Sequence, residues 1–71
     1  MRKFELINNT EPIKLMAKIG STCVEIEDSP FLSFIRSVDK TKKDFISVVF
    51  NDESGYSYDQ IVHISQLKEI E

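Results

Sequence analysis

The sequence predicts one small, mainly β domain over residues 1–71, built from five or six short antiparallel strands that close into a barrel. Three observations carry this prediction. Hydrophobic residues make up 41% and charged residues 30% of the 71, values typical of a globular domain rather than a disordered segment. A chain of this length buries about 60% of its unfolded surface, enough for one core. The apolar residues come in short bursts separated by turn-forming residues, which indicates a β-meander.

The first two bursts precede residue 20. Phe4, Leu6 and Ile7 form the first, and the Asn- and Pro-containing run 8–12 ends it. Residues 13–19 then alternate with a period of two, which predicts a strand. Its apolar face would consist of Ile13, Leu15, Ala17 and Ile19.

A third burst at 23–27 predicts a strand with Val24 and Ile26 facing inward and Cys23 facing outward. The Gly-Ser-Thr sequence before it is a plausible tight turn. We therefore expect this strand to pair with 13–19 as a hairpin.

Residues 29–38 are compatible with two structures. In the first, Ser29 caps a helix that begins at Pro30, and four apolar residues share one helical face. These four are Phe31, Phe34, Ile35 and Val38. In the second, the segment is extended and leads into the polar run 39–44, which predicts a hairpin loop. This context favours a strand over roughly 33–38, entered by a helical turn at 29–32.

The strongest strand pattern lies at residues 45–50, which are rich in β-branched and aromatic side chains. Ile46, Val48 and Phe50 would share one face of this strand. A turn is predicted at 51–55, with Gly55 in a left-handed conformation. The chain would then return along the strand through its two tyrosines.

The C-terminal segment again leaves two structures open. Its apolar residues recur every three positions from Tyr58 to Ile70. One interpretation is a single 3-10 turn at 58–60 followed by a strand at 61–64. The other is a C-terminal helix that begins near Asp59.

A barrel built from these strands has one shared interior. We expect thirteen large side chains to form it: Ile13, Leu15, Ile19, Val24, Ile26, Phe34, Val38, Ile46, Val48, Phe50, Tyr58, Ile61 and Ile64.

Residues 34–64 run strand, polar loop, strand, turn, strand and short turn, which is similar to the end of SH3-like and Sm-like small barrels. In those folds a hairpin is followed by a one-turn 3-10 helix and a short closing strand. The same stretch resembles the small bacterial YolD-like proteins. Its matching residues are Ile35, Val38, Asp39, Ile46, Ile61 and Ile64. The resemblance implies an SH3-like barrel. The chain lacks the glycine pair and aromatic cluster of SH3 peptide binders and the nucleotide-pocket signature of Sm proteins, so no binding residue is carried over.

The reactive residue types do not form a motif for catalysis, and we expect neither an enzyme nor a bound cofactor or metal. Cys23 and His63 are the single cysteine and histidine, too far apart in sequence for a zinc motif. Cys23 is expected to be a packed thiol and His63 a half-exposed strand residue. One cysteine suits a reducing, cytoplasmic compartment, and the apolar runs are too short for a membrane span.

Surface recognition remains as the predicted function. The net charge of −3 disfavours non-specific binding of nucleic acid, and Asp39 and Asp44 flank the basic run 40–43. We therefore expect a protein partner, with a nucleic-acid-binding barrel as the alternative and a homodimer through an edge strand as a further possibility. The candidate interaction patch consists of Phe31, Arg36, Lys40, Lys42, Lys43, Phe45 and Tyr56.

Overall fold

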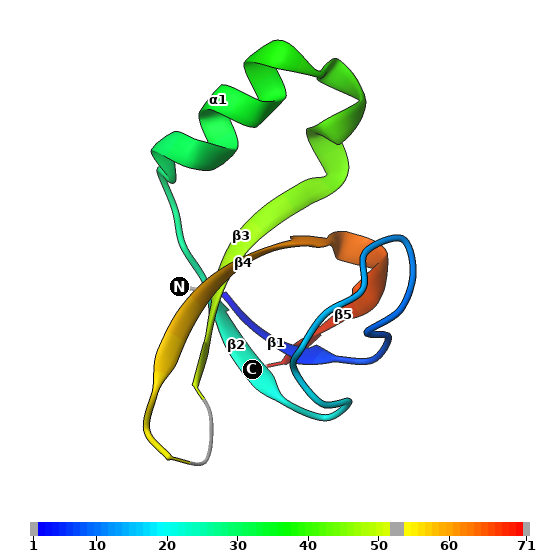
Figure 1. Ribbon diagram of the computed structural model, residues 1–71, viewed down its shortest axis with the longest axis vertical. Coiled ribbons are helices and arrows are strands. Elements are labelled where there is room, and N and C mark those ends of the chain that lie inside the picture. Colours follow the sequence, from blue (N-terminus) through cyan, green and yellow to red (C-terminus); the bar gives the residue numbers. More distant parts are fainter. Residues whose placement is uncertain (1, 52–53, 71) are drawn as a thin grey trace.

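The computed structural model describes residues 2–51 and 54–70. Its elements, in chain order, are β1 (Lys3–Leu6), β2 (Thr22–Glu25), α1 (Pro30–Val38), η1 (Lys40–Asp44), β3 (Phe45–Asn51), β4 (Ser57–His63), η2 (Ile64–Gln66) and β5 (Leu67–Ile70), where η denotes a 3-10 helix (Figure 1). Across the described residues, the strands form one five-stranded antiparallel sheet in the order β4-β3-β2-β1-β5. The predicted mainly β architecture is therefore confirmed.

Closure of this sheet into a barrel is not shown. Within the described residues β4 and β5 lie at opposite ends of the strand order, and no ladder of hydrogen bonds joins them. The longest ladder pairs β3 with β4, from Phe45 opposite His63 to Asn51 opposite Ser57. The ladder between β1 and β5 pairs residues from the two ends of the chain, with Lys3 opposite Ile70. The sheet therefore brings both ends of the described chain together.

Strand β3 confirms the clearest sequence pattern. It occupies the middle of the chain between β2 and β4, and the predicted face of Ile46, Val48 and Phe50 is buried. Gly55 has a φ of 88°, the left-handed conformation expected at the hairpin turn. Asp52 and Glu53 of that predicted turn lie outside the described residues.

The predicted strand at 13–19 is wrong, because this segment lies in the long connection between β1 and β2. Hydrogen bonds within the connection hold it in place: the Leu15 amide donates to the carbonyl of Asn9 at 2.7 Å, and the Asn9 side chain donates to the carbonyl of Ala17 at 3.0 Å. Leu15 and Ala17 are buried while Ile19 is exposed. The period of two therefore reflects a loop that inserts alternate side chains into the core.

The predicted hairpin between 13–19 and 23–27 is also wrong, since β2 pairs with β1 and β3. Its facing is reversed as well. Cys23 is buried in the core, whereas Val24 and Ile26 are half-buried. The expectation of a packed thiol is confirmed, and burial raises the pKa of Cys23 to about 11.

This buried thiol gives a test of the β2 facing. At pH 8 a shift of two pKa units lowers the thiolate fraction about 100-fold, so we expect a disulfide reagent to react at least that much more slowly with the native domain than with the domain in urea. Because the thiol ionises first in the unfolded chain, its contribution to stability is complete below pH 9.0 and falls as the pH rises towards about 11. Cys23→Ala should lack this component of the pH dependence of urea unfolding. Equal reaction rates in both states would place Cys23 on the surface.

Both structures that the sequence suggested for the C-terminal segment are wrong. Residues 58–60 belong to β4, and the 3-10 turn lies later, at Ile64–Gln66. The alternative C-terminal helix is also wrong, because β5 follows directly. His63 ends β4 as a half-buried residue, in agreement with the prediction. It also caps η2, accepting a hydrogen bond at Nδ1 from the Ser65 amide at 3.1 Å.

The core differs from the predicted set in a systematic way. Its buried hydrophobic cluster consists of Phe4, Leu6, Leu15, Ala17, Cys23, Ile46, Val48, Phe50, Val62 and Leu67, with Ile13 and Tyr58 packed against it. Four of the thirteen predicted core residues are instead exposed, namely Ile19, Phe34, Val38 and Ile64. The first and last strands therefore supply core residues, Phe4 and Leu6 from β1 and Leu67 from β5, that were not among the predicted ones.

Candidate docking surface

Helix α1 replaces the strand predicted at 33–38, and its ends explain why. The Ser29 hydroxyl accepts a hydrogen bond from the Leu32 amide at 3.3 Å, and Pro30 occupies the first turn, where it needs no amide partner. At the other end the Asp39 amide donates to the carbonyl of Ile35 at 2.9 Å. These hydrogen bonds stabilise both ends of a helix. The segment is therefore helical although the polar run that follows it favoured a strand.

Asp39 also caps the N-terminal end of η1. Its carboxylate accepts hydrogen bonds from the side chain and the amide of Thr41, at 2.6 and 3.0 Å. These bonds lower the pKa of Asp39, with a smaller contribution from the positive charge of Lys42. One carboxylate thus fixes the corner at which the chain leaves α1 and turns into the basic η1.

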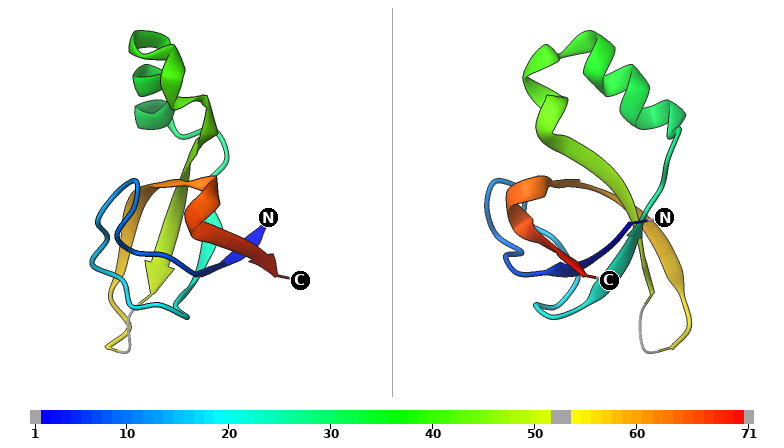
Figure 2. Two further views of the ribbon diagram at one scale, coloured as in Figure 1. Left: turned by 90° about the vertical axis from the view of Figure 1, so that its right-hand side faces the viewer. Right: turned by 180° about the vertical axis from the view of Figure 1, so that it is seen from behind.

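Helix α1 and η1 stand beyond one end of the sheet, as the views in Figures 1 and 2 show. Leu32 is the one residue of α1 that is buried. Arg36 adds a second attachment by donating a hydrogen bond to the carbonyl of Phe45 at the start of β3. The helix is therefore held at two points and leaves much of its surface uncovered.

Three large apolar side chains lie on the uncovered surface of α1. Phe31, Phe34 and Val38 have exposed fractions of 62%, 65% and 71%. They are spaced i, i+3 and i+7, so they share one face of the helix, which we call the α1 stripe. The α1 stripe leaves on the order of 300 Å² of apolar surface in water, a size that in monomers often marks a functional site.

Basic side chains gather where α1 leads into η1, and one of them, Arg36, lies on the face of α1 opposite the α1 stripe. Arg36, Lys40 and Lys43 line an open hollow of about 340 Å³. Lys42 is turned the other way, with its ammonium 4.9 Å from the centre of the Phe45 ring in a cation–π contact. Lys40 and Lys43 are therefore the η1 cations that are exposed to a partner.

The structure brings together five of the seven predicted patch residues on α1 and η1: Phe31, Arg36, Lys40, Lys42 and Lys43. The other two predicted patch residues, Phe45 and Tyr56, do not belong to this surface. Phe45 is buried, with its ring 5.0 Å from that of His63 in an edge-to-face contact. Tyr56 is exposed but precedes β4 at the far end of the seven-residue strand β3, about 20 Å from η1. A surface on α1 and η1 therefore excludes Tyr56.

Sequence reasoning missed Phe34 and Val38 as surface residues because it assigned both to the core. Their helical spacing together with Ser29 and Pro30 was the signal that could have found them. An exposed acidic pair, Glu27 and Asp28, precedes α1. Asp28 has a φ of 59°, a left-handed turn that directs the chain into the helix.

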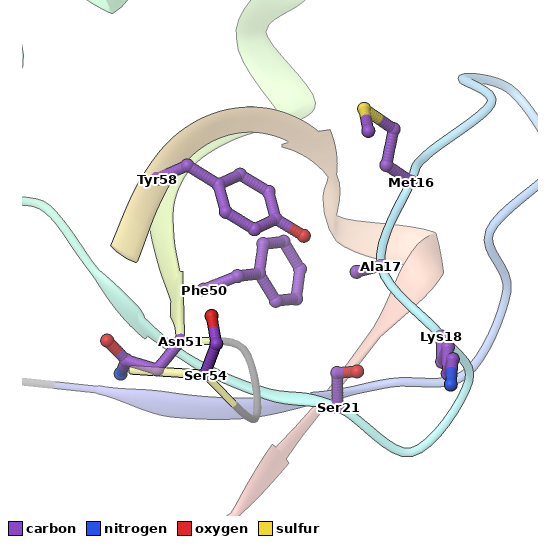
Figure 3. Close-up of a pocket in the computed structure, with 8 residues that line it drawn as sticks. All are labelled: Met16, Ala17, Lys18, Ser21, Phe50, Asn51, Ser54 and Tyr58. Atoms are coloured by element: carbon purple, nitrogen blue, oxygen red, sulfur yellow. The ribbon is translucent and has the colours of Figure 1, made fainter. Parts of the chain in front are cut away.

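A second hollow of about 320 Å³ lies between the β1–β2 connection and the β3–β4 hairpin (Figure 3). The stacked rings of Phe50 and Tyr58, 5.7 Å apart, form its floor, and the Tyr58 hydroxyl points toward the connection. Lys18 is its one charged lining residue among those described. These lining residues offer an apolar contact surface but no acid–base pair.

The described residues contain no group of three or more His, Cys, Asp or Glu side chains placed to hold a metal ion. Neither α1 nor the 3-10 helices in this part of the chain have the length and apolar character needed to cross a membrane. No family model, curated protein or solved structure matches the chain.

Proposed function

We propose that this domain is a non-catalytic interaction module that binds another protein through the α1 stripe. The observation that carries the proposal is the exposure of Phe31, Phe34 and Val38 on one face of a helix that stands clear of the sheet. Exposing three large apolar side chains together costs solubility and contributes nothing to the core. A partner that covers them would recover that free energy on binding.

The chemistry of the surface selects a helical partner segment with an apolar face and acidic residues. Apolar side chains at i, i+3 and i+7 are the pattern by which helices dock against other helices or grooves. Residues 29–44 carry four basic and two acidic side chains, although the whole chain has a net charge of −3. Acidic groups on the partner would therefore be attracted to Lys40 and Lys43 and steered to this end of the domain.

The same proposal includes an SH3-like barrel and a cytoplasmic location. Two features support the fold: β1 lies between β2 and β5 in the strand order, and a one-turn 3-10 helix separates β4 from the closing strand β5. The buried, unpaired Cys23 supports a reducing compartment.

Two designed peptides test the docking surface. Both carry the same apolar helical stripe, flanked by Glu in one and by Lys in the other. We expect the Glu peptide to shift the amide resonances of α1 and η1 in an NMR titration at low protein concentration, and the Lys peptide to bind at least about tenfold more weakly. Phe34→Ser should weaken binding of the Glu peptide by at least about tenfold. The matched control is Ile19→Ser, which removes another exposed apolar side chain, at 56% against 65% for Phe34, from the β1–β2 connection.

The alternative of nucleic-acid binding has its own outcome in this experiment. A labelled single-stranded oligonucleotide would bind with an affinity that falls steeply with salt and is reduced by Lys43→Glu, which reverses an exposed charge of η1. That result, together with no response to the Glu peptide, would replace the proposal.

A further inference from the structure

We propose that the hollow lined by Arg36, Lys40 and Lys43 binds a single dianionic phosphoryl group, carried by a phosphorylated side chain or present as free phosphate. We call this hollow the basic hollow. Arg36 lies on the face of α1 opposite the α1 stripe, so the inference goes beyond the proposed function and does not rest on it.

The geometry of η1 brings two lysines to one side. A 3-10 helix has three residues per turn, so side chains three positions apart lie above one another. Lys40 and Lys43 have this spacing, and both line the basic hollow. Lys42 lies on another side, where its ammonium is 4.9 Å from the centre of the Phe45 ring. Two of the three η1 lysines therefore present their charges to the same space.

Arg36 supplies the third positive charge, and the sheet holds it in position. Its Nη2 donates a hydrogen bond to the carbonyl of Phe45, the first residue of β3. A guanidinium has five N–H donors, so the others remain for a ligand. Their planar arrangement matches two oxygens of a phosphoryl group. Because the side chain is already anchored, binding an anion costs less ordering entropy.

The three charges of the basic hollow are not neutralised by ion pairs. Among residues 2–51 and 54–70, the ion pairs are those of Arg2 with Glu25 and Glu69. The carboxylate of Asp39 instead accepts two hydrogen bonds from Thr41. Three positive charges around one hollow repel one another unless an anion lies between them. The basic hollow is therefore complementary to a small group with more than one negative charge.

Acidic side chains beside the basic hollow favour a single group over a long polyanion. Arg36 also lines a neighbouring hollow with Glu25, Glu27 and Asp28, and Asp44 at the end of η1 is exposed. A nucleic-acid strand carries one charge per nucleotide along an extended track and would meet these carboxylates. A phosphate monoester instead concentrates about two negative charges at one point. The net charge of −3 disfavours a polyanion further.

The size and exposure of the basic hollow determine how strongly it binds. Its volume is about 340 Å³, and a phosphoryl group fills the space of a few water molecules of about 30 Å³ each. The hollow therefore admits the group together with the side chain that carries it. Because Lys40 and Lys43 are exposed to water and salt, each contact is weak, and we expect a dissociation constant on the order of 1 mM at low salt.

An NMR titration of the full chain in phosphate-free buffer of low ionic strength tests the site. The probes are N-acetyl-phosphoserine amide, N-acetyl-serine amide, inorganic phosphate and dimethyl phosphate, a diester with one charge. We expect the phosphoserine compound to shift the amide resonances of η1 and Phe45, and the serine compound to shift none. Dimethyl phosphate should bind at least about tenfold more weakly than the phosphoserine compound, because it carries half the charge.

Inorganic phosphate distinguishes the two sources of the group. Binding at least as tight as that of the phosphoserine compound supports a site for free phosphate. Weaker binding supports a site for a phosphorylated side chain.

Lys43→Gln and its matched control Lys42→Gln separate the basic hollow from the overall charge of η1. Each substitution removes one positive charge, but only Lys43 lines the hollow. Lys43→Gln should weaken binding of the phosphoserine compound about fivefold, and Lys42→Gln less than about twofold, with native circular dichroism spectra for both.

Two outcomes would overturn the inference. The first is the absence of resonance shifts with the phosphoserine compound at about 20 mM. The second is equal weakening by the two lysine substitutions, which would show attraction to the net charge of η1 and not to the basic hollow. Phe34→Ser should leave phosphate binding unchanged, so failure of this site can be told apart from failure of the α1 stripe.

Discussion

Val48→Asp is expected to unfold the domain. Val48 has an exposed fraction of 0% and lies in β3, between β2 and β4. A carboxylate there must either stay charged without water or take up a proton at neutral pH, and the apolar contacts of the valine are lost as well. Together these effects cost on the order of 7 kcal/mol, comparable with the whole stability of about 4–11 kcal/mol expected for a chain of this length. We expect the sharp thermal transition and the dispersed NMR spectrum to disappear.

The matched control is the same substitution at Val38, which has an exposed fraction of 71%. Val38→Asp should leave a cooperatively folded domain and weaken binding at the α1 stripe. The sequence pattern placed both valines in the core, whereas the structure buries Val48 and exposes Val38. If only Val48→Asp unfolds the domain, the structure is right about both positions. Cooperative melting of Val48→Asp would mean that the described facing of β3 is wrong.

Gln66→Leu is expected to cost about 3 kcal/mol of unfolding free energy. Gln66 is fully buried, and its side-chain amide donates to the carbonyls of Asn8 at 3.0 Å and Ile13 at 2.8 Å. Its carbonyl accepts a hydrogen bond from the His63 amide at 3.3 Å. Leucine has a similar volume but leaves these three backbone groups without their partner, so the loss is one of hydrogen bonding and not of packing. Urea unfolding measures it.

Gln60→Leu provides the comparison for this loss. Gln60 is half-buried on β4 and makes one long hydrogen bond, to the carbonyl of Ile61 at 3.4 Å. Its replacement should change the unfolding free energy by less than about 0.5 kcal/mol. Equal effects of the two substitutions would show that Gln66 does not tie the β1–β2 connection to η2.

The sequence predicts elements well where local preference and tertiary position agree. At β3 the β-branched and aromatic residues favour an extended chain, and a central position in the sheet buries them. At residues 13–19 the same alternation occurs in a loop, because Leu15 and Ala17 insert into the core while backbone hydrogen bonds to Asn9 shape the chain. An alternation of apolar residues indicates which side chains are buried. It does not indicate whether the backbone forms the hydrogen-bonded ladder of a β-sheet.

The candidate site was predictable in part for a related reason. The helical face of Phe31, Phe34 and Val38 was visible in the sequence, but the polar run 39–44 was interpreted as a hairpin loop, and this context favoured a strand. The basic residues of η1 were found because three of them fall within four consecutive positions, 40–43. Phe45 was misplaced because no local pattern shows that it pairs with His63 on β4, against whose ring its own ring packs. Nothing local indicates that Gln66 is buried, because its partners Asn8 and Ile13 precede it by more than fifty residues.

The pairing of β1 with β5 determines how the domain would respond to force. Lys3 and Ile70 are opposite one another at one end of that ladder, and the two strands run in opposite directions. Tension applied between the two ends of the described chain would therefore load these hydrogen bonds one after another, as in a zipper, rather than all at once. Separation of β5 would remove Leu67 from the core, so the domain should yield at low force, beginning where its first and last strands meet.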